Sequence, residues 1–241
     1  MSVDAIAQQL VRAAAEGSQR RVVVAVSGIP GSGKSTLAYP LAERVNALAG
    51  REVAICVGID GWHYSQAELR GMENPSHLFA RRGAHFTFDA ESYASFVSAL
   101  DTTPTLPFPT FSHADKDPVQ HGGEVRPEHR VIIIEGLHAH LDVVPWSTAA
   151  ARYDYTIWVD TPRAVARERI VRRHLREGVE DTPDAAARRA DQSDMVNADT
   201  LLGNRLVPSI VVDLDAAESV VAPAVAAGAA VLFTAAAGIT A

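Results

Sequence analysis

The feature that most constrains how this chain can fold is a glycine-rich stretch at residues 28–36. Its sequence is Gly28-Ile29-Pro30-Gly31-Ser32-Gly33-Lys34-Ser35-Thr36. The apolar run at residues 22–26 precedes it and a helix-compatible segment at residues 37–48 follows it, which predicts the order strand, loop, helix. The stretch fits the phosphate-binding pattern G-x-x-x-x-G-K-[ST], whose fixed positions are here Gly28, Gly33, Lys34 and Ser35. An ordinary Gly/Ser turn is the alternative, but four fixed positions between a strand and a helix rarely coincide by chance.

The residue types of this stretch suit the phosphate groups of a nucleotide. Glycines allow backbone N–H groups to wrap around an anion, and the N-terminal end of the following helix attracts negative charge. Lys34 would reach the β- and γ-phosphates, and the hydroxyl of Ser35 would bind Mg²⁺. We therefore expect a nucleotide-binding loop whose binding residues are Gly28, Pro30, Gly31, Ser32, Gly33, Lys34, Ser35 and Thr36.

Composition and charge narrow the class of protein. At 241 residues, of which 47% are hydrophobic and 21% charged, the chain is long enough to bury the core of a folded soluble protein. The net charge of −7 gives no overall attraction to nucleic acid or to an anionic membrane, so neither is expected as a partner. The single cysteine, Cys56, rules out an intrachain disulfide and is expected to be a buried strand thiol within residues 53–59. Because we see neither a signal peptide nor a membrane-spanning run, we expect a cytoplasmic protein.

Further apolar runs alternate with helical segments along the chain. The runs expected to form strands lie at residues 22–26, 53–59, 131–134, 155–159 and 209–212. This alternation predicts an α/β fold, a doubly wound and mainly parallel five-stranded sheet with helices on both faces. We expect residues 1–241 to form a single domain. A last strand at residues 229–233 is compatible with the sequence, and we assign no role to the alanine-rich segment 216–241.

Two acidic residues follow predicted strands, at the edge where open α/β sheets bind ligands. Asp60 comes after the run at residues 53–59 and begins the cluster Asp60-Gly61-Trp62-His63-Tyr64, which suits the floor of a substrate site. The alternative is a helix capped by Asp60, with the aromatic side chains in the core. Glu135 ends the strand at residues 131–134, and an acidic residue there, after a phosphate loop, is typical of a group that holds or orients Mg²⁺.

Polar residues elsewhere indicate one more functional segment. Residues 102–127 are rich in proline, and we expect a long functional loop there, around Phe111-Ser112-His113-Ala114-Asp115-Lys116-Asp117-Pro118. Lysine occurs at positions 34 and 116 alone, so Lys116 is a candidate ligand contact, with a solvated side chain as the alternative. His138 and His140 have no partner at metal-ligand spacing, and we interpret them as loop or packing residues.

After Thr161-Pro162, a predicted helix carries four arginines on one face. They are Arg169, Arg172, Arg173 and Arg176. Four guanidinium groups on one face repel one another unless an anion approaches, so in a phosphoryl-transfer enzyme this face would clamp ATP phosphates when a lid closes. The alternative is a solvated helix face paired with Glu168 and Glu177. We expect the helical lid to span about residues 163–194.

Several segments together resemble one enzyme family. They are residues 28–36, Ile59-Asp60-Gly61-Trp62-His63-Tyr64, Arg81-Arg82-Gly83-Ala84, Thr87-Phe88-Asp89, Phe111-Ser112-His113, Ile134-Glu135-Gly136-Leu137, Asp194-Met195-Val196-Asn197 and Asn204-Arg205-Leu206. Over about residues 21–213 the chain resembles the P-loop kinase family that includes uridine kinase, phosphoribulokinase and bacterial pantothenate kinase. The resemblance is greatest to its uridine-kinase-related members of unassigned substrate. Many families share the phosphate loop, whereas the segments at Asp60 and Arg82 are much more specific.

The resemblance implies the P-loop NTPase fold, with ATP and Mg²⁺ as cofactors, and a role for each matching residue. Asp60 would be the catalytic base, with Lys34 beside the transferred phosphate. Ser35 and Glu135 would bind Mg²⁺. The catalytic arginines of the lid would be Arg169 and Arg173. Contacts with the phosphate acceptor would come from Asp60, His63, Tyr64, Arg82 and His113, with Lys116 as a further candidate.

Two departures from the family pattern leave the acceptor open. Phe111-Ser112-His113 stands where pyrimidine-nucleoside kinases carry a Tyr-Asp-based segment, and pantothenate kinases place a tyrosine before the Ser-His pair. We therefore predict transfer of the ATP γ-phosphate to a hydroxyl of a small metabolite such as a nucleoside, a sugar, glycerate or a pantothenate-like compound. An ATPase or nucleotide-dependent switch without such an acceptor, and an inactive nucleotide-binding scaffold, remain alternatives. The sequence also leaves a homodimer open.

Overall fold

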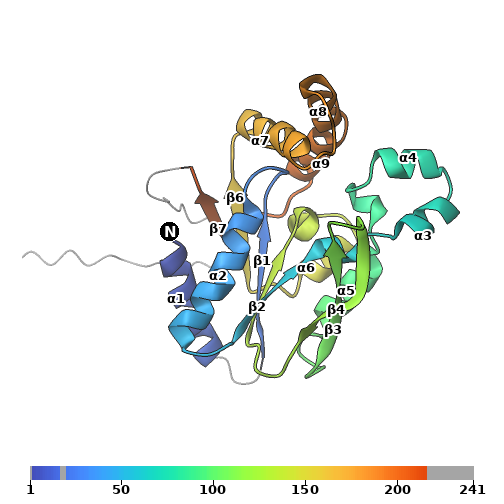
Figure 1. Cartoon of the computed structure of the whole chain (residues 1–241). Helices are drawn as coiled ribbons and strands as arrows, with labels where there is room; N and C mark the ends of the chain where they lie inside the picture. The colour runs from blue at the N-terminus through green and yellow to red at the C-terminus, as the bar shows by residue number, and fades with distance from the viewer. Residues whose placement is uncertain (1, 17–19, 216–241) are drawn as a thin grey trace, which may run out of the picture.

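Five strands form one parallel sheet in the computed structural model, which describes residues 2–16 and 20–215 (Figure 1). Their order is β2-β5-β1-β6-β7. They are β1 (Val22–Ser27), β2 (Ala54–Gly58), β5 (Val131–Glu135), β6 (Tyr155–Asp160) and β7 (Ile210–Asp213). In the central strand β1, Val24 is in register with Ile133 of β5 and with Tyr155 of β6. These strands coincide with the five apolar runs of the sequence, so the predicted sheet is confirmed.

Helices cover both faces of this sheet. Those on one face are α1 (Val3–Glu16) and α2 (Lys34–Ala49). Those on the other are α5 (Ala90–Ala99), α6 (Trp146–Ala150) and α9 (Met195–Gly203). Val24 belongs to the first core with Leu10 and Leu41, whereas Val23 belongs to the second with Trp146. Because successive strand residues point to opposite faces, a strand with a core on each side needs a continuous apolar run, which confirms the doubly wound arrangement.

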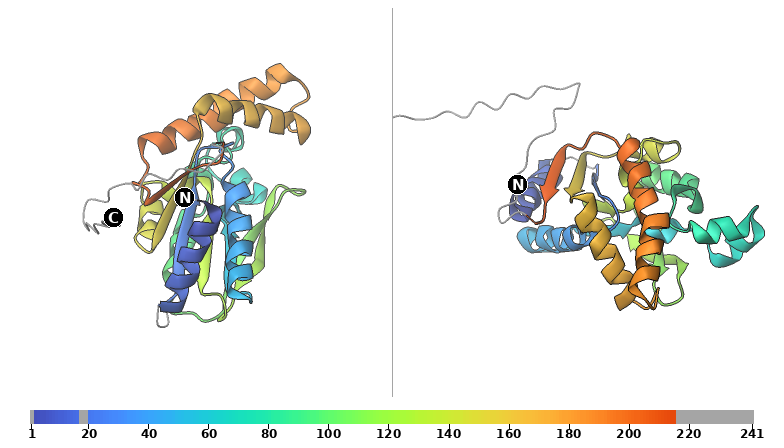
Figure 2. Two further views of the ribbon diagram at one scale, coloured as in Figure 1. Left: turned by 90° about the vertical axis from the view of Figure 1, so that its left-hand side faces the viewer. Right: turned by 90° about the horizontal axis from the view of Figure 1, so that it is seen from above.

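Three helical segments lie above the carboxyl ends of the strands (Figure 2). They are α7 (Arg163–Arg176), α8 (Pro183–Arg189) and the π-helical turn Ala190–Asp194, which runs directly into α9. Gly178 has a φ of 64° just after α7, and the side chain of Thr182 caps α8 by accepting a hydrogen bond from the N–H of Ala185. The helices predicted for the lid are therefore confirmed, and their closure stays a prediction.

The segment predicted to be a long loop at residues 102–127 is instead a β-hairpin, so that prediction was wrong. β3 (Leu106–Ser112) pairs antiparallel with β4 (Asp117–Val125), outside the main sheet. Pro107 and Pro109 interrupt β3, and the register shifts between Phe108 and Thr110, which hides the strand pattern in the sequence. Proline is tolerated here because each strand of a two-stranded ribbon keeps one edge without a neighbour.

A helical excursion between β2 and α5 projects to the right in Figure 1. It contains α3 (Gln66–Gly71) and α4 (Pro75–Ala80), two short helices that the sequence analysis did not assign. A capping box starts α3, in which the hydroxyl of Ser65 accepts from the N–H of Glu68 and the Glu68 carboxylate accepts from the N–H of Ser65. The 3₁₀ turn η1 (Ile59–Trp62) precedes this excursion and carries Asp60.

Two sequence expectations, the strand at residues 229–233 and the alanine-rich segment 216–241, lie outside the described residues. Within residues 2–16 and 20–215, none of the helices combines the length and the apolar composition that crossing a membrane requires.

Candidate active site

The phosphate loop joins β1 to α2 in a conformation that depends on its glycines. Gly31 and Gly33 have φ angles of 81° and 92°, in the left-handed region. A Cβ atom on Gly28 would lie 2.7 Å from the carbonyl oxygen of Val159, and one on Gly31 would collide with the backbone of Ala166. The loop is therefore packed against β6 and α7, and these contacts fix its position at the end of the sheet.

A cavity of about 590 Å³ opens between the phosphate loop and α7. We call it the donor cavity. Residues 31–36 form one wall, and Arg169, Arg173 and Arg176 of α7 contribute to the other. Cationic side chains, backbone N–H groups and the start of a helix together make a site suited to the phosphates of a nucleotide.

The four arginines predicted on one face of α7 do not share one environment. Arg172 is 70% exposed, pairs with Glu168 at 3.1 Å and lies outside the donor cavity. Arg176 lines the cavity while also pairing with Glu177 at 3.2 Å. Solvated ion pairs and cavity-lining guanidinium groups thus occur on the same helix, and the clamping of ATP phosphates by this face stays a prediction.

Ser35 and Glu135 lie close enough to bind one divalent cation together. The Oγ atom of Ser35 donates a hydrogen bond to Oε1 of Glu135 over 3.2 Å. Burial raises the pKa of Glu135, and the ammonium group of Lys34 opposes that rise. Mg²⁺ in kinases is bound by one or two oxygen ligands of the protein together with substrate phosphates, so this hydroxyl and carboxylate fit the predicted metal.

A second cavity, of about 760 Å³, is bordered by η1, the hairpin and α9. We call it the acceptor cavity. Lys34, Ser35 and Arg173 line both cavities, so the two meet at these side chains. Asp60 lines the acceptor cavity alone, and its side chain is 57% exposed. The Asp60 carboxylate thus faces the acceptor side, and the phosphate loop the donor side, of the point where the two cavities meet.

A close backbone approach holds η1 against the hairpin. A Cβ atom on Gly61 would collide with the carbonyl group of Pro109 in β3, so only glycine allows this contact. Next to it, Nδ1 of His63 lies 2.9 Å from the carbonyl oxygen of Asp60 and 3.9 Å from its Oδ1. Burial lowers the pKa of His63, which favours the neutral imidazole. The hairpin thus becomes a wall of the site beside Asp60.

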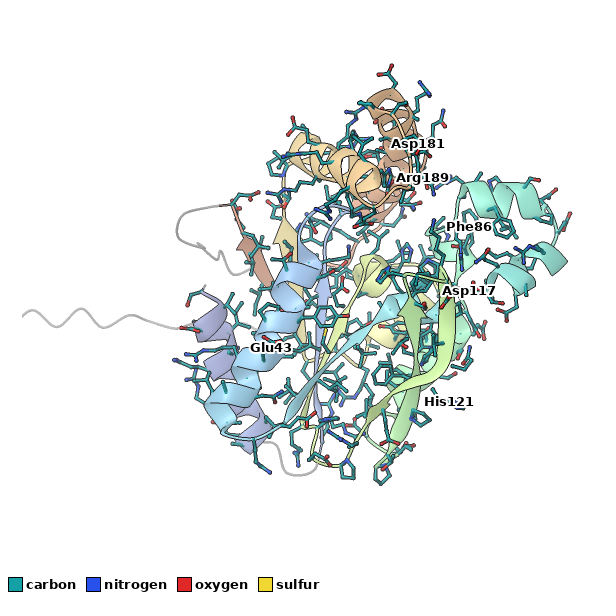
Figure 3. All side chains as sticks on the ribbon, in the orientation of Figure 1. Glu43, Phe86, Asp117, His121, Asp181 and Arg189 are labelled. Atoms are coloured by element: carbon teal, nitrogen blue, oxygen red, sulfur yellow. The ribbon has the colours of Figure 1, made fainter. Side chains whose placement is uncertain are left out.

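Arg82 joins the hairpin turn to the segment that follows η1. Its Nη2 donates to the carbonyl oxygen of Tyr64 and to Oδ1 of Asp117, both over 3.0 Å. Its Nη1 donates to the carbonyl oxygen of Lys116. Figure 3 shows Asp117 near the end of the hairpin that faces α3, with His121 farther along it. The guanidinium group therefore joins two segments that are distant in the sequence.

Three of the predicted acceptor contacts border the acceptor cavity together with Asp60, and two do not. Those that border it are His63, Arg82 and His113. Tyr64 and Lys116 lie outside its walls, and Lys116 is exposed on the hairpin turn. Their contacts with an acceptor stay predictions.

Several residues of the acceptor cavity were not singled out in the sequence. Tyr39 lies one turn after Ser35 on α2, a spacing that indicates a shared face once the start of the helix is known. Burial raises the pKa of Tyr39 to about 12, so its hydroxyl stays protonated. Asn197 on α9 also lines the cavity, although only the family resemblance drew attention to its segment. Cys56 lies on β2, as predicted, where burial raises the pKa of its thiol, but the residue is only partly buried and borders the cavity.

His138 and His140 are packing residues, as predicted. Their exposed fractions are 4% and 0%, and Nε2 of His138 lies 3.1 Å from the carbonyl oxygen of Gly83. Burial lowers the pKa of His138 to about 3 and that of His140 to about 4. In the part of the chain that the structure describes, no three His, Cys, Asp or Glu side chains form a group that could hold a metal ion.

The parallel sheet, the phosphate loop and the helices over its end define a P-loop kinase fold. The model of one family, "Phosphoribulokinase / Uridine kinase family", matches residues 23–181, which is more than half of the chain. The chain therefore belongs to the phosphoribulokinase/uridine kinase family.

Individual relatives agree with this assignment. The chain is 40% identical over 195 residues to "Putative uridine kinase C227.14" of Schizosaccharomyces pombe, which covers 80% of this chain and 83% of the relative. It is 41% identical over 153 residues to "ATP-dependent kinase-like protein notR'" of Aspergillus versicolor, over 61% of this chain and 89% of the relative. A crystal structure of a "putative fructose transport system kinase" from Silicibacter sp. TM1040 superposes with a TM-score of 0.79 at 34% identity, over 88% and 98% of the two chains. These names agree on a kinase and differ in the acceptor, so the family indicates ATP-dependent phosphotransfer without identifying the molecule phosphorylated.

Proposed function

We propose that this chain transfers the γ-phosphate of ATP to a hydroxyl group of a small metabolite bound in the acceptor cavity. The observation that carries the proposal is the junction of the donor and acceptor cavities at Lys34, Ser35 and Arg173. A phosphate held by the loop and a hydroxyl beside Asp60 could approach each other there. Holding both reactants in one geometry is the main contribution that an enzyme makes to phosphoryl transfer.

Asp60 is the group that we propose as the general base. Its carboxylate accepts the proton of the acceptor hydroxyl while the hydroxyl oxygen forms a bond to the γ-phosphorus. The bond between that phosphorus and the oxygen that bridges the β- and γ-phosphates breaks at the same time, which leaves ADP. The attacking and leaving oxygens lie roughly in line in such a transfer.

Cationic groups at the junction stabilise the negative charge that spreads over the transferred phosphoryl group. We assign this role to Lys34 and Arg173, which line both cavities, and to Arg169, which lines the donor cavity alone. Ser35 and Glu135 would hold Mg²⁺, which would supply positive charge beside the phosphates. The metabolite needs only one free hydroxyl in reach of Asp60.

Two alternative functions would use the donor cavity alone. An ATPase or nucleotide-dependent switch would release phosphate at a rate that no metabolite changes, and an inactive scaffold would bind ATP without turnover. The acceptor cavity of about 760 Å³ favours the kinase, because neither alternative requires it. The hydrogen bond between Ser35 and Glu135 also supports an intact metal site and opposes the scaffold.

The test is a screen for acceptor-dependent formation of ADP with nucleosides, sugars, glycerate and pantothenate. We expect one of these groups to stimulate ADP formation by the native chain, and no group to stimulate it in Asp60→Asn. Thermal stabilisation by ATP, measured on both proteins, shows whether the variant still binds nucleotide. ATP hydrolysis that no compound stimulates and that Asp60→Asn leaves unchanged would contradict the proposal.

A further inference from the structure

Few cations of the acceptor cavity are available to an anionic ligand. Among the described residues, the lysine and arginine side chains that line it are Lys34, Arg82 and Arg173. Lys34 and Arg173 also line the donor cavity, where the phosphates of ATP would engage them. A phosphate or carboxylate on the acceptor would therefore depend on Arg82 for its counter-charge.

Arg82 is already engaged by protein groups. Its side chain is 15% exposed and its guanidinium pairs with Asp117 at 3.0 Å, while the carbonyl oxygens of Tyr64 and Lys116 accept from the same group. Its Nε is buried and has no hydrogen-bond partner, so the two Nη groups make the contacts named above. Binding an anion through the Nη groups would require these bonds to break and would remove a link between the hairpin turn and the backbone of Tyr64. Arg82 thus acts as a positioning residue for the cavity wall.

Carboxylates, in contrast, face the acceptor cavity. Asp60 is 57% exposed, and its ion-pair neighbour His63 lies 3.9 Å away with a pKa that burial lowers. Asp194 also lines the cavity and is paired with His174 at 3.3 Å, whereas Glu135, another carboxylate of this wall, is the proposed Mg²⁺ ligand. An acceptor that brought its own negative charge next to Asp60 would meet repulsion, and each lysine or arginine that lines the described cavity wall would already be engaged by ATP phosphates or by protein groups.

The remaining wall offers neutral groups. Phe88, Phe108 and Phe111 supply aromatic surface, and the hydroxyl of Tyr39 supplies a protonated donor. Oδ1 of Asn197 accepts from Arg81 over 2.8 Å, which leaves the amide nitrogen to donate. Apolar walls with a few fixed polar groups are typical of sites for small uncharged molecules.

We infer that the acceptor is an uncharged, polyhydroxylated molecule of the sugar or nucleoside type, and not a phosphorylated or carboxylated metabolite. This inference rests on the proposed kinase function and narrows its substrate. It removes glycerate and pantothenate from the candidates, because both carry a carboxylate at neutral pH.

A separation of metabolites by charge tests the inference even while the acceptor is unidentified. Small metabolites from cells of the organism that encodes the chain are passed over an anion-exchange resin, and the flow-through and the salt eluate are desalted. Each fraction is incubated with the full chain and ATP labelled at the γ-phosphate, and labelled products are resolved by chromatography. Asp60→Asn serves as the matched control that distinguishes transfer by this enzyme from contaminating activity.

We expect the labelled product from the flow-through alone. A labelled product from the eluate, at an equal or higher rate, would overturn the inference while supporting the kinase function. No labelled product from either fraction would contradict the proposed function itself, and the inference with it.

A second measurement uses matched compounds and salt. Nucleosides are compared with their 3′- and 5′-monophosphates, and hexoses with their 1- and 6-phosphates and with the corresponding sugar acids, so that each primary hydroxyl is free in at least one charged compound of each set. Like charges placed together at a binding surface cost several kcal/mol, so we expect kcat/KM to be at least about 100-fold higher for the uncharged member. Salt should raise the KM for ATP and leave the KM for the acceptor within about twofold, because screening weakens charge pairs but not neutral hydrogen bonds. An acceptor KM that rises in parallel with that of ATP would overturn the inference.

Discussion

The donor and acceptor cavities share three side chains but are built in different ways. The donor cavity is formed mainly by one continuous segment, residues 31–36, and one helix, α7. The acceptor cavity draws on segments as far apart as Tyr39, the hairpin and Asn197. Phosphate binding is thus a largely local property, whereas acceptor binding is assembled by the fold. Changes in the hairpin or in α9 can alter the acceptor and leave the phosphate loop intact.

Asp60→Asn should separate the two cavities most strongly. Asparagine keeps the shape of the side chain but cannot accept the proton of the acceptor, so we expect kcat to fall by about 10³-fold. The ATP dissociation constant should change by less than about twofold, since Asp60 lines the acceptor cavity alone. Turnover assays and calorimetric ATP titration measure the two effects. Loss of ATP binding together with turnover would mean that Asp60 has a structural role.

Lys34→Ala should affect both cavities, because Lys34 lies at their junction. We expect kcat to fall by about 10²- to 10³-fold, and ATP to bind more weakly, because a cation that faces the transferred phosphate is lost. Arg172→Ala is the matched control, since it removes a nearby positive charge outside the donor cavity. Turnover by Lys34→Ala equal to that of the native chain would contradict the assignment of the phosphate loop.

Acid should weaken the acceptor side of the molecule. His138 and His140 have pKa values of about 3 and about 4 in the fold, against an ordinary value of 6.5. Between these values the unfolded chain binds more protons, so the free energy of unfolding falls as the pH falls from about 6.5 toward 4. At about pH 5 the free energy of unfolding is lower than at neutral pH by about 2 kcal/mol for each histidine.

Urea denaturation at about pH 7.5 and pH 5 measures this loss. His138→Gln should show a smaller difference between the two pH values than the native chain, whatever its absolute stability. Hydrogen exchange at acid pH should increase near Gly83, whose carbonyl oxygen lies 3.1 Å from His138, more than in the phosphate loop. An unaltered pH dependence in the variant would remove His138 as a cause.

Gly61→Ala should damage acceptor binding without a direct effect on the donor. A methyl group there would collide with the Pro109 carbonyl and push the hairpin away from Asp60. We expect an increase in the acceptor KM of about tenfold and a loss of stability of about 1–3 kcal/mol, with the ATP KM nearly unchanged. Gly71→Ala is the matched control, because a Cβ atom at Gly71 would meet nothing within 4 Å. Equal effects of the two substitutions would contradict the proposed contact.

The smallest effect is expected from Tyr39→Phe. Loss of one neutral hydrogen bond to the acceptor corresponds to about 1 kcal/mol, so the acceptor KM should rise about fivefold while ATP binding stays constant. Tyr155→Phe, on β6 outside both cavities, controls for the loss of a hydroxyl. An unchanged acceptor KM in Tyr39→Phe would exclude its hydroxyl from acceptor binding.

The sequence predicted the donor cavity better than the acceptor cavity, because the donor cavity is largely local and the acceptor cavity is assembled from distant segments. The phosphate loop was predicted because its fixed residues lie within eight consecutive positions. Asp60 and Glu135 were predicted because each follows an apolar run directly in the sequence. The hairpin was missed because Pro107, Pro109 and a bulge break the alternation that marks a strand. Tyr39 was missed because its role depends on which way α2 faces.

The sequence by itself determined the parallel sheet and the phosphate loop. It also determined that Asp60 and Glu135 lie at the carboxyl edge of the sheet. Continuous apolar runs require burial on both faces, and glycines at left-handed positions permit the loop, so both patterns are local. Only the tertiary structure decided that Arg172 points away from the donor cavity and that Arg82 is engaged by Asp117. It also decided that Tyr39 and Asn197 meet in one cavity. These facts depend on how distant segments pack, and packing between segments leaves no fixed spacing in the sequence.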